Sequence, residues 1–206
     1  MGKSSSNKQW LLKQQKDPYV KQSQQSHYRS RAVYKLMEID KKDGLLGKGQ
    51  LVIDLGAAPG SWSQYASEQV GEQGKVIAID ILPMEEIHNV LFIKGDFTDQ
   101  RTYDQCLESL NDGYADLVIS DMAPNLSGIK VTDQARSLYM AELAASLACQ
   151  ALRTGGSMLV KVFQGSGVDE FRHHLKEYFK KVMTRKPMAS RNSSREFYVL
   201  ARGFAL

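Results

Sequence analysis

The sequence predicts an α/β protein with a mostly parallel, seven-stranded sheet that carries helices on both faces. From residue 50 onwards, short apolar runs alternate with stretches of helical spacing, an alternation that is typical of parallel sheets covered on both sides. A turn rich in glycine and proline, residues 56–60, joins the first apolar run to the next helical stretch. The length of 206 residues suits one such domain, and 42% hydrophobic with 24% charged residues is a globular composition.

Each element follows from its local pattern, taken in chain order. Residues 30–39 place apolar side chains at helical spacing and precede Gly44 and Gly47, which predicts a helix that ends there. Apolar runs predict strands at 51–54, 75–80, 90–94, 115–120, 157–162, 181–184 and 197–201. Helical stretches are expected at 61–70, 99–110, 133–153 and 168–179. Because no helix separates the last two strands, we expect them to form an antiparallel edge.

Residues 1–28 are expected to form a basic N-terminal tail that is mobile or ordered only on a partner, ahead of a single domain over 29–206. The tail is rich in Gln, Ser and Lys and lacks a sustained apolar period. No run approaches the ~18 apolar residues of a membrane span, and no apolar segment of a secretion signal follows the first basic residues. Cys106 and Cys149 stand singly in helical stretches, which excludes a disulfide framework and a cysteine-based zinc site. We therefore expect a cytoplasmic protein without a metal site.

Charge is distributed unevenly along the chain. Residues 1–31 and 172–202 carry net charges of +6 and +7, and the region between them carries −9. Two basic arms around an acidic centre fit a polyanionic partner that both arms contact. Two ordinary solvated faces would produce the same pattern, so charge alone leaves both readings open.

The turn DLGAAPGSWS at 54–63 is the strongest local indication of a ligand site. Gly56 and Gly60 would let a ligand approach the backbone at the carboxyl edge of the sheet. Ala58 stands where the dinucleotide fingerprint has its middle glycine, and the Lys-Ser/Thr ending of a P-loop is missing. A nucleoside without a pyrophosphate therefore fits this turn better than NAD or ATP does.

Three acidic residues follow the ends of successive expected strands: Asp80, Asp96 and Asp121. A carboxylate at Asp80 can accept two hydrogen bonds from a ribose diol, and Asp96 can accept one from the amine of an adenine. Each residue by itself could equally be a turn former. Together with the glycine turn, the three acids predict a nucleoside pocket.

Lys161 lies inside the apolar run LVKVF at 159–163. Burying a lysine without a partner is unfavourable, so Lys161 either sits at an edge with its stem along the surface or is a functional group beside an acid. Asp121 on the preceding strand is its natural neighbour. By contrast, Lys35 in a helix and Glu196 at a strand end would ordinarily be solvated surface residues.

Four segments together resemble the FtsJ/RrmJ family of S-adenosylmethionine-dependent ribosomal RNA 2′-O-ribose methyltransferases. The segments are DLGAAPGSWSQ, SDMAPN, LVKVFQG and SSREFYVLARG, and the resemblance extends from RSRAVYKL at 29–36 to the C-terminus. It implies a Rossmann-like class I methyltransferase fold with seven strands, and S-adenosyl-L-methionine as cofactor. The bacterial members methylate a uridine of 23S rRNA in the large ribosomal subunit, so the resemblance implies 23S rRNA as the partner. We expect no membrane and no obligate protein partner, and a monomer, because nothing in the sequence demands more.

The resemblance also assigns site residues. The family's catalytic Lys-Asp-Lys-Glu tetrad falls on Lys35, Asp121, Lys161 and Glu196. The expected cofactor contacts are Gly56, Gly60, Trp62, Asp80, Asp96 and Asp121. The SDMAPN loop departs from the Asp/Asn-Pro-Pro-aromatic loop of amino-methyltransferases, which favours an oxygen acceptor.

The implied reaction is a direct in-line methyl transfer, in which the enzyme aligns the donor with the 2′-oxygen and assists loss of its proton. Lys161 would be the general base if it is neutral, and it would stabilise a developing alkoxide if it is charged. Lys35 favours the neutral form and Asp121 the charged one, so the sequence leaves the choice open. Asp121 would orient Lys161 and the donor, and Glu196 would hold a lysine or the substrate ribose.

Basic residues of both arms are expected to contact RNA phosphates. They are Lys8, Lys13, Lys16, Lys21, Arg29, Arg31, Lys180, Lys181, Arg185, Lys186, Arg191 and Arg195. Tyr19, Tyr28 and Tyr198 either stack on an unpaired base or pack within the protein.

Three other functions compete with methylation of 23S rRNA. They are 2′-O-methylation of tRNA or of the mRNA cap, a large-subunit assembly factor that mainly binds RNA, and an NAD oxidoreductase. Ala58 and Lys161 disfavour the oxidoreductase.

Overall fold

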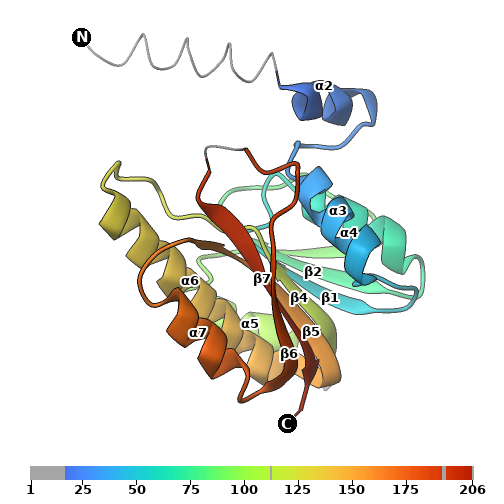
Figure 1. Cartoon of the computed structure of the whole chain (residues 1–206). Coiled ribbons are helices and arrows are strands. Elements are labelled where there is room, and N and C mark those ends of the chain that lie inside the picture. Colours follow the sequence, from blue (N-terminus) through green and yellow to red (C-terminus); the bar gives the residue numbers. More distant parts are fainter. Residues whose placement is uncertain (1–16, 112, 192–193, 206) are drawn as a thin grey trace.

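The computed structural model describes residues 17–111, 113–191 and 194–205 (Figure 1). Within them, seven strands form one sheet in the order β3-β2-β1-β4-β5-β7-β6. The strands are β1 (Leu51–Leu55), β2 (Lys75–Asp80), β3 (Val90–Lys94), β4 (Ala115–Ser120), β5 (Leu152–Phe163), β6 (Phe179–Arg185) and β7 (Glu196–Phe204). Strands β1 to β5 pair in parallel, whereas β7 pairs antiparallel with both β5 and β6. The expected α/β class and the antiparallel edge are confirmed.

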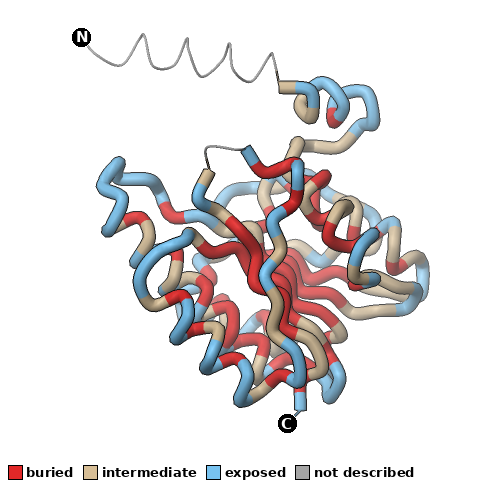
Figure 2. The backbone as a smooth tube through the Cα atoms, viewed as in Figure 1, coloured by how far each residue is buried: buried red, intermediate tan, exposed pale blue. Residues whose placement is uncertain are grey.

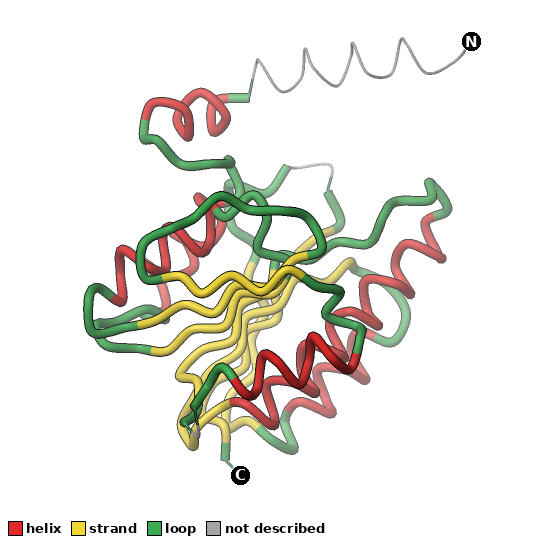
Figure 3. The backbone as a smooth tube through the Cα atoms, turned by 180° about the vertical axis from the view of Figure 1, so that it is seen from behind, coloured by secondary structure: helices red, strands yellow, loops and turns green. Residues whose placement is uncertain are grey.

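Helices cover both faces of the sheet, as Figures 1 and 3 show from opposite sides. The helices are α2 (Pro18–Gln25), α3 (Val33–Asp43), α4 (Ser61–Val70), α5 (Gln100–Glu108), α6 (Lys130–Ala151) and α7 (Val168–Leu175). The apolar sides of α3 and α4 pack on one face, where Leu36 and Ala66 share a core cluster with the strands. The opposite face is covered by α5, α6 and α7, with Cys106, Ala144 and Phe171 in its cluster. Among the described residues, every helix falls short of the length or apolar content that crossing a lipid bilayer requires.

Burial on both faces explains why the central strands are continuous apolar runs (Figure 2). Residues 76–79 of β2 and 117–119 of β4 are fully buried, so a polar side chain on either face of these strands would lack water. Because parallel strands all end at the same edge, the residues that follow them are brought together there. The antiparallel β7 contributes its first residue to this edge, since Glu196 pairs in register with Phe163 at the end of β5.

Several boundaries differ from the expected ones because strand pairing overrides local helical spacing. Helix α6 ends at Ala151 rather than 153, since Leu152 already pairs with Ala115 in the sheet. Helix α7 ends at Leu175 rather than 179, because β6 begins at residue 179 and pairs with the end of β7. Helix α6 begins at Lys130, three residues earlier than expected.

Helix α2 lies in the segment that was expected to be a tail without structure of its own. Asp17 caps the helix by accepting a hydrogen bond from the backbone N–H of Tyr19 at 3.0 Å. The Tyr19 ring contacts the Tyr34 ring of α3 at 5.5 Å, and Arg31 forms an ion pair with Asp17. Residues 17–28 thus include a helix that contacts the rest of the protein, and residues 1–16 lie outside the described part. The division into a tail and a domain over 29–206 stays a prediction.

Candidate active site

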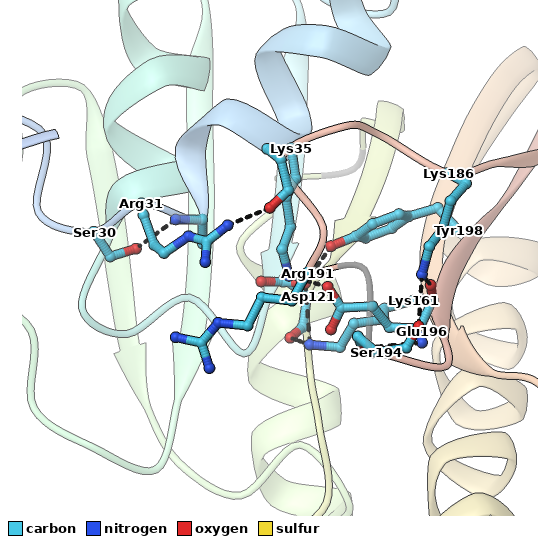
Figure 4. A network of polar contacts seen from close by, with 12 residues as sticks. Ser30, Arg31, Lys35, Asp121, Lys161, Lys186, Arg191, Ser194, Glu196 and Tyr198 are labelled. Atoms are coloured by element: carbon cyan, nitrogen blue, oxygen red, sulfur yellow. Dashed lines mark hydrogen bonds and ion pairs between the residues drawn. The ribbon is translucent and has the colours of Figure 1, made fainter. Parts of the chain in front are cut away.

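Four charged side chains from separate elements meet at the carboxyl edge of the sheet (Figure 4). Lys161 of β5 places its Nζ 3.0 Å from Asp121 Oδ1 and donates to the Asp121 backbone oxygen at 2.5 Å. Lys35 of α3 places its Nζ 2.8 Å from Glu196 Oε1 and 3.7 Å from Asp121 Oδ1. The four residues that the resemblance assigned as a tetrad therefore form one chain of ion pairs, although they are up to 161 positions apart in the sequence.

The electrostatics of this cluster keep both carboxylates ionised. Burial would raise the pKa of Asp121, but the ammonium groups of Lys161 and Lys35 outweigh it, so the pKa lies below its usual value. Burial likewise opposes ionisation of Glu196, and the charge of Lys35 again lowers the pKa below the usual value. Two ionised carboxylates thus face two lysine side chains inside a largely dry site.

Tyr198 is a fifth member that the sequence analysis did not identify as part of the site. Its hydroxyl donates to Asp121 Oδ1 at 2.6 Å, and its fully buried ring lies 5.7 Å from the Trp62 ring. Burial first, and then the nearby Asp121 charge, raise the pKa of Tyr198 well above its usual value, so the hydroxyl stays a donor. Its burial excludes the stacking on an RNA base considered above. The register could have revealed it, since Tyr198 lies opposite Lys161.

A cavity of about 430 Å³ opens beside Asp121, at the ends of β1 to β4. Its walls include Gly56, Asp80, Asp96 and Asp121, and Phe97 adds an aromatic surface. Gly56 adopts φ +74° and lies so close to Met122 that an added Cβ would be 2.3 Å from Met122 Cγ. A side chain at position 56 would therefore fill or distort this part of the cavity wall.

The carboxylates in this cavity are held by the backbone around them. Asp80 accepts hydrogen bonds from Ala58 N at 2.9 Å and Leu82 N at 2.8 Å, one at each oxygen, which leaves a lone pair on both for a diol. Asp96 accepts from Thr98 N at 2.9 Å and Thr98 Oγ1 at 2.7 Å, both at Oδ1. The acids, the aromatic wall and the volume all suit a nucleoside.

A second cavity, of about 370 Å³, also borders the tetrad. Its lining includes Lys35 and Glu196 of the tetrad together with Ser30, Arg31, Arg191 and Ser194. Asp121 lines the first cavity, and Lys35, which lines the second, places its Nζ 3.7 Å from Asp121 Oδ1. Members of the tetrad thus line both a cavity suited to a nucleoside and a cavity that carries cationic side chains.

Comparison with known proteins identifies the family. The FtsJ-like methyltransferase family model matches residues 28–204. The chain is 53% identical over 204 residues to "Ribosomal RNA large subunit methyltransferase E" of Marinobacter nauticus and 52% identical to the protein of that name in Pseudomonas aeruginosa, covering 99% of each chain in both cases. The chain belongs to the FtsJ-like methyltransferase family. As a member it is a methyltransferase, and its cofactor is S-adenosylmethionine.

Solved structures agree with this assignment. A chain from Plasmodium falciparum described as a ribosomal RNA methyltransferase is similar with a TM-score of 0.78 and 33% identity, covering 86% of this chain and 98% of that one. The fibrillarin/Nop5p complex matches with a TM-score of 0.56 and 19% identity, over 85% of both chains, and shows the fold alone. The expected Rossmann-like methyltransferase fold is confirmed.

Not all expected cofactor contacts of this FtsJ-like chain lie in the nucleoside cavity. The Trp62 side chain is buried against the sheet, and its Nε1 donates to Ala32 O at 2.8 Å, so it anchors the start of α3 instead. Gly60 caps α4 with φ +104°, and its Cα faces Met84, Ile87 and Arg29. A ligand could contact these two residues through the backbone at the start of α4, because the first turn of a helix leaves N–H groups without intrahelical acceptors.

Arg29, expected to contact RNA, is committed to the protein. Its guanidinium donates to Pro59 O at 3.1 Å, Glu85 O at 2.9 Å and Glu86 O at 2.9 Å. These contacts tie the glycine turn to the loop after β2, and Leu82 at the start of that loop lines the nucleoside cavity. Arg29 therefore stabilises the cofactor side of the site.

The other basic residues expected to contact RNA differ in whether they are paired within the protein and in how near they lie to the tetrad. Arg185 forms two hydrogen bonds with the Asp43 carboxylate, at 2.7 and 2.6 Å, and Lys186 donates to the backbone oxygens of Ser194 and Glu196. Lys180 and Lys181 begin β6 opposite the end of β7, which places them at the far edge of the sheet. Arg191 and Arg195 are exposed beside the tetrad. Lys8, Lys13 and Lys16 lie outside the described residues.

Asp54 is a buried acid that no expected role uses. Ser63 Oγ donates to its Oδ2 at 2.6 Å, which joins the end of β1 to the first turn of α4. Burial, with the charges of Asp121 and Asp80, raises the pKa of Asp54 to about 7, although the Ser63 hydrogen bond opposes this.

Proposed function

We propose that the chain transfers the methyl group of S-adenosylmethionine to the 2′-oxygen of a uridine ribose in 23S rRNA of the large ribosomal subunit. The observation that carries this proposal is a connected tetrad whose members line both a nucleoside cavity, through Asp121, and a cationic cavity, through Lys35 and Glu196. A donor and an acceptor bound in the two cavities would both lie next to the tetrad. The relatives named for large-subunit ribosomal RNA, at 52–53% identity, support the choice of RNA.

On the donor side, the residues of the nucleoside cavity match the parts of the cofactor. Asp80 would accept the ribose hydroxyls, and Asp96 would accept the adenine amine against the face of Phe97. The backbone N–H groups at the start of α4, including that of Trp62, would bind the carboxylate of the cofactor. When bound, S-adenosylmethionine supplies a methyl group that its sulfonium charge has already activated. The Asp121 carboxylate, which lines the same cavity, would balance that positive charge.

On the acceptor side, Lys161 is the group that acts on the 2′-hydroxyl. Asp121 holds its ammonium group through the side chain and the backbone oxygen, which fixes the direction of Nζ. A neutral Lys161 removes the hydroxyl proton, and a charged Lys161 stabilises the negative charge that develops on the oxygen. The pH dependence of single-turnover transfer distinguishes the two: a rising limb marks the neutral amine, and its absence in the neutral range marks the ammonium.

Lys35 and Glu196 position the acceptor ribose. The two residues form an ion pair of 2.8 Å and both line the cationic cavity, so a ribose bound there would have an acceptor and a donor for its hydroxyls. Arg31 and Arg191 line the same cavity, but Arg31 is held by Asp17 and the Ala189 backbone oxygen. The more exposed Arg191, whose Nε lies 3.9 Å from Asp17, is therefore the one that would turn to a phosphate beside that ribose. We further propose that the protein acts in the cytoplasm, where bacterial large subunits reside, and that it acts as a monomer.

The experiment that tests this function measures methyl transfer from labelled S-adenosylmethionine to three acceptors: undermethylated large subunits, free 23S rRNA and tRNA. We expect label in the large-subunit RNA, resistant to alkaline cleavage at a uridine because the 2′-oxygen carries it. Label only in tRNA would overturn the proposed substrate. Failure to label any acceptor, despite cofactor binding, would favour an assembly factor and overturn the catalytic proposal.

A further inference from the structure

We propose that a third, smaller cavity beside the acceptor site binds the nucleobase attached to, or next to, the reacting ribose. This inference rests on the proposed function and extends it to base recognition. The cavity, here called the base cavity, has a volume of about 210 Å³ and is lined by Leu126, Lys130, Gln134, Phe163, Gln164 and Arg195, among others. That volume is below the ~300–1,000 Å³ of sites for larger ligands and suits a single ring system.

The base cavity continues directly from the acceptor site. Ser194 lines both the cationic cavity and the base cavity, and its Oγ accepts a hydrogen bond from the backbone N–H of Glu196 at 3.2 Å (Figure 4). Phe163 lies two residues beyond Lys161 on β5 and pairs in register with Glu196. A base held here would therefore be within one nucleotide of a ribose at the tetrad.

The side chains of the base cavity have the chemistry that recognises an unstacked base. Phe163 and the largely exposed Leu126 offer apolar surfaces to the faces of a ring. Gln134 and Gln164 carry amides, each with a donor and an acceptor, for the polar edge of a ring. Lys130 and Arg195 are exposed cations for the flanking phosphates.

The walls of the base cavity are held in place before any ligand binds. Asp133 accepts hydrogen bonds from Ser127 N at 2.7 Å, Ser127 Oγ at 2.8 Å and Gly128 N at 3.2 Å, which fixes the loop before α6. Asp133 is the acid among the lining residues, and these bonds occupy its carboxylate. The Gln134 side chain donates a hydrogen bond to the Ser166 backbone oxygen at 2.7 Å. It also packs closely against Gly165, since a Cβ added to that glycine would lie 2.5 Å from Gln134 Cγ. A fixed cavity favours binding because little freedom is lost on association.

A synthetic RNA with a single base isolates this contact from general phosphate binding. The probe is a pentamer of ribose phosphates in which only the central residue carries a uracil, and its reference is the same pentamer without any base. We expect the full-length wild type to bind the uracil pentamer about tenfold more tightly by fluorescence anisotropy, as base–aromatic contact contributes in single-stranded RNA complexes. Phe163→Ala should reduce this ratio to twofold or less.

Two further variants keep the result interpretable. Leu126→Ala removes an exposed side chain, cannot create a core cavity, and should lower the ratio about threefold. Tyr139→Ala removes an exposed aromatic side chain of α6 outside the cavity and should leave the ratio unchanged. Equal binding of the two pentamers by the wild type would overturn the proposal, as would a preference that survives both Phe163→Ala and Leu126→Ala. Because no methyl transfer is measured, failure of the base cavity is distinct from failure of the proposed function.

Discussion

Replacing Lys35 by methionine tests the charge balance of the tetrad. The Lys35 and Glu196 side chains are only 12% and 15% exposed, and their charged atoms lie 2.8 Å apart. Removing one partner of a buried ion pair costs about 3–5 kcal/mol, because the remaining charge is left without compensation. Lys161 remains beside Asp121 and some water reaches Glu196, so we expect Lys35→Met to lower the free energy of unfolding by about 2–3 kcal/mol at pH 7.5.

The effect should depend on pH in a defined direction. In the wild type the pKa of Glu196 is lowered, so this group contributes stability that is present above its unfolded pKa of about 4.3 and is lost as pH falls through the folded value. Without Lys35, burial is left as the main influence and raises the pKa of Glu196, so the variant loses stability as pH rises instead. The difference between variant and wild type should therefore be smaller at pH 4.5 than at pH 7.5.

Urea unfolding at the two pH values provides the assay. The double variant Lys35→Met/Glu196→Gln removes the uncompensated charge, so its free energy of unfolding should return to within about 1 kcal/mol of wild type while methyl transfer stays lost. Lys41→Met, an exposed lysine of the same helix, is the matched control and should change stability by less than about 0.5 kcal/mol. Wild-type stability of Lys35→Met at pH 7.5, or an equal loss at both pH values, would refute the reasoning.

Three further predictions concern other parts of the chain. Arg29→Lys keeps the charge but cannot replace all three hydrogen bonds to backbone carbonyls. Calorimetry should therefore show about five- to tenfold weaker S-adenosylmethionine binding, with RNA affinity unchanged. Weaker RNA binding with unchanged cofactor affinity would instead indicate that Arg29 contacts phosphate. Because the pKa of Asp54 is raised to about 7, wild-type stability from this group is present near pH 4 and is lost as pH rises through 7, by up to about 4 kcal/mol. In urea unfolding without cofactor, Asp54→Asn should remove this decrease of the free energy of unfolding between pH 5 and 8. An unchanged pH dependence would contradict the raised pKa of Asp54. Deleting residues 1–28 should weaken RNA binding and also lower the melting temperature, because Arg31 loses its ion pair with Asp17. An unchanged melting temperature would show that the segment does not stabilise the domain.

The donor half of the site could be predicted from local sequence. Asp80, Asp96 and Asp121 each follow an apolar run, and the parallel sheet brings such positions to one edge whatever the strand order. Lys161 was identifiable because a lysine inside an apolar strand requires a partner. No single one of these four residues was decisive, but their shared position at the ends of neighbouring strands was sufficient to predict that they meet.

The acceptor half could not be predicted in this way. Lys35 and Glu196 look like ordinary surface residues until the packing of α3 against β7 buries both, and only the resemblance to a family identified them. Trp62 was assigned to the cofactor, and for Tyr198 both base stacking and packing within the protein were left open, because a sequence does not show which face of an element an aromatic ring will occupy. Helix α2 was missed because tertiary contacts, rather than an apolar period, hold it in place.

Single-turnover methyl transfer by Lys161→Ala tests the central claim most directly, with S-adenosylmethionine affinity measured on the same protein. Lys161 does not line the nucleoside cavity in the described structure, so cofactor affinity should stay within about threefold of wild type. Loss of the group that assists the 2′-oxygen should slow transfer about 100-fold or more. Transfer within a few-fold of the wild-type rate would contradict both roles proposed for Lys161 and would remove the tetrad from the chemistry.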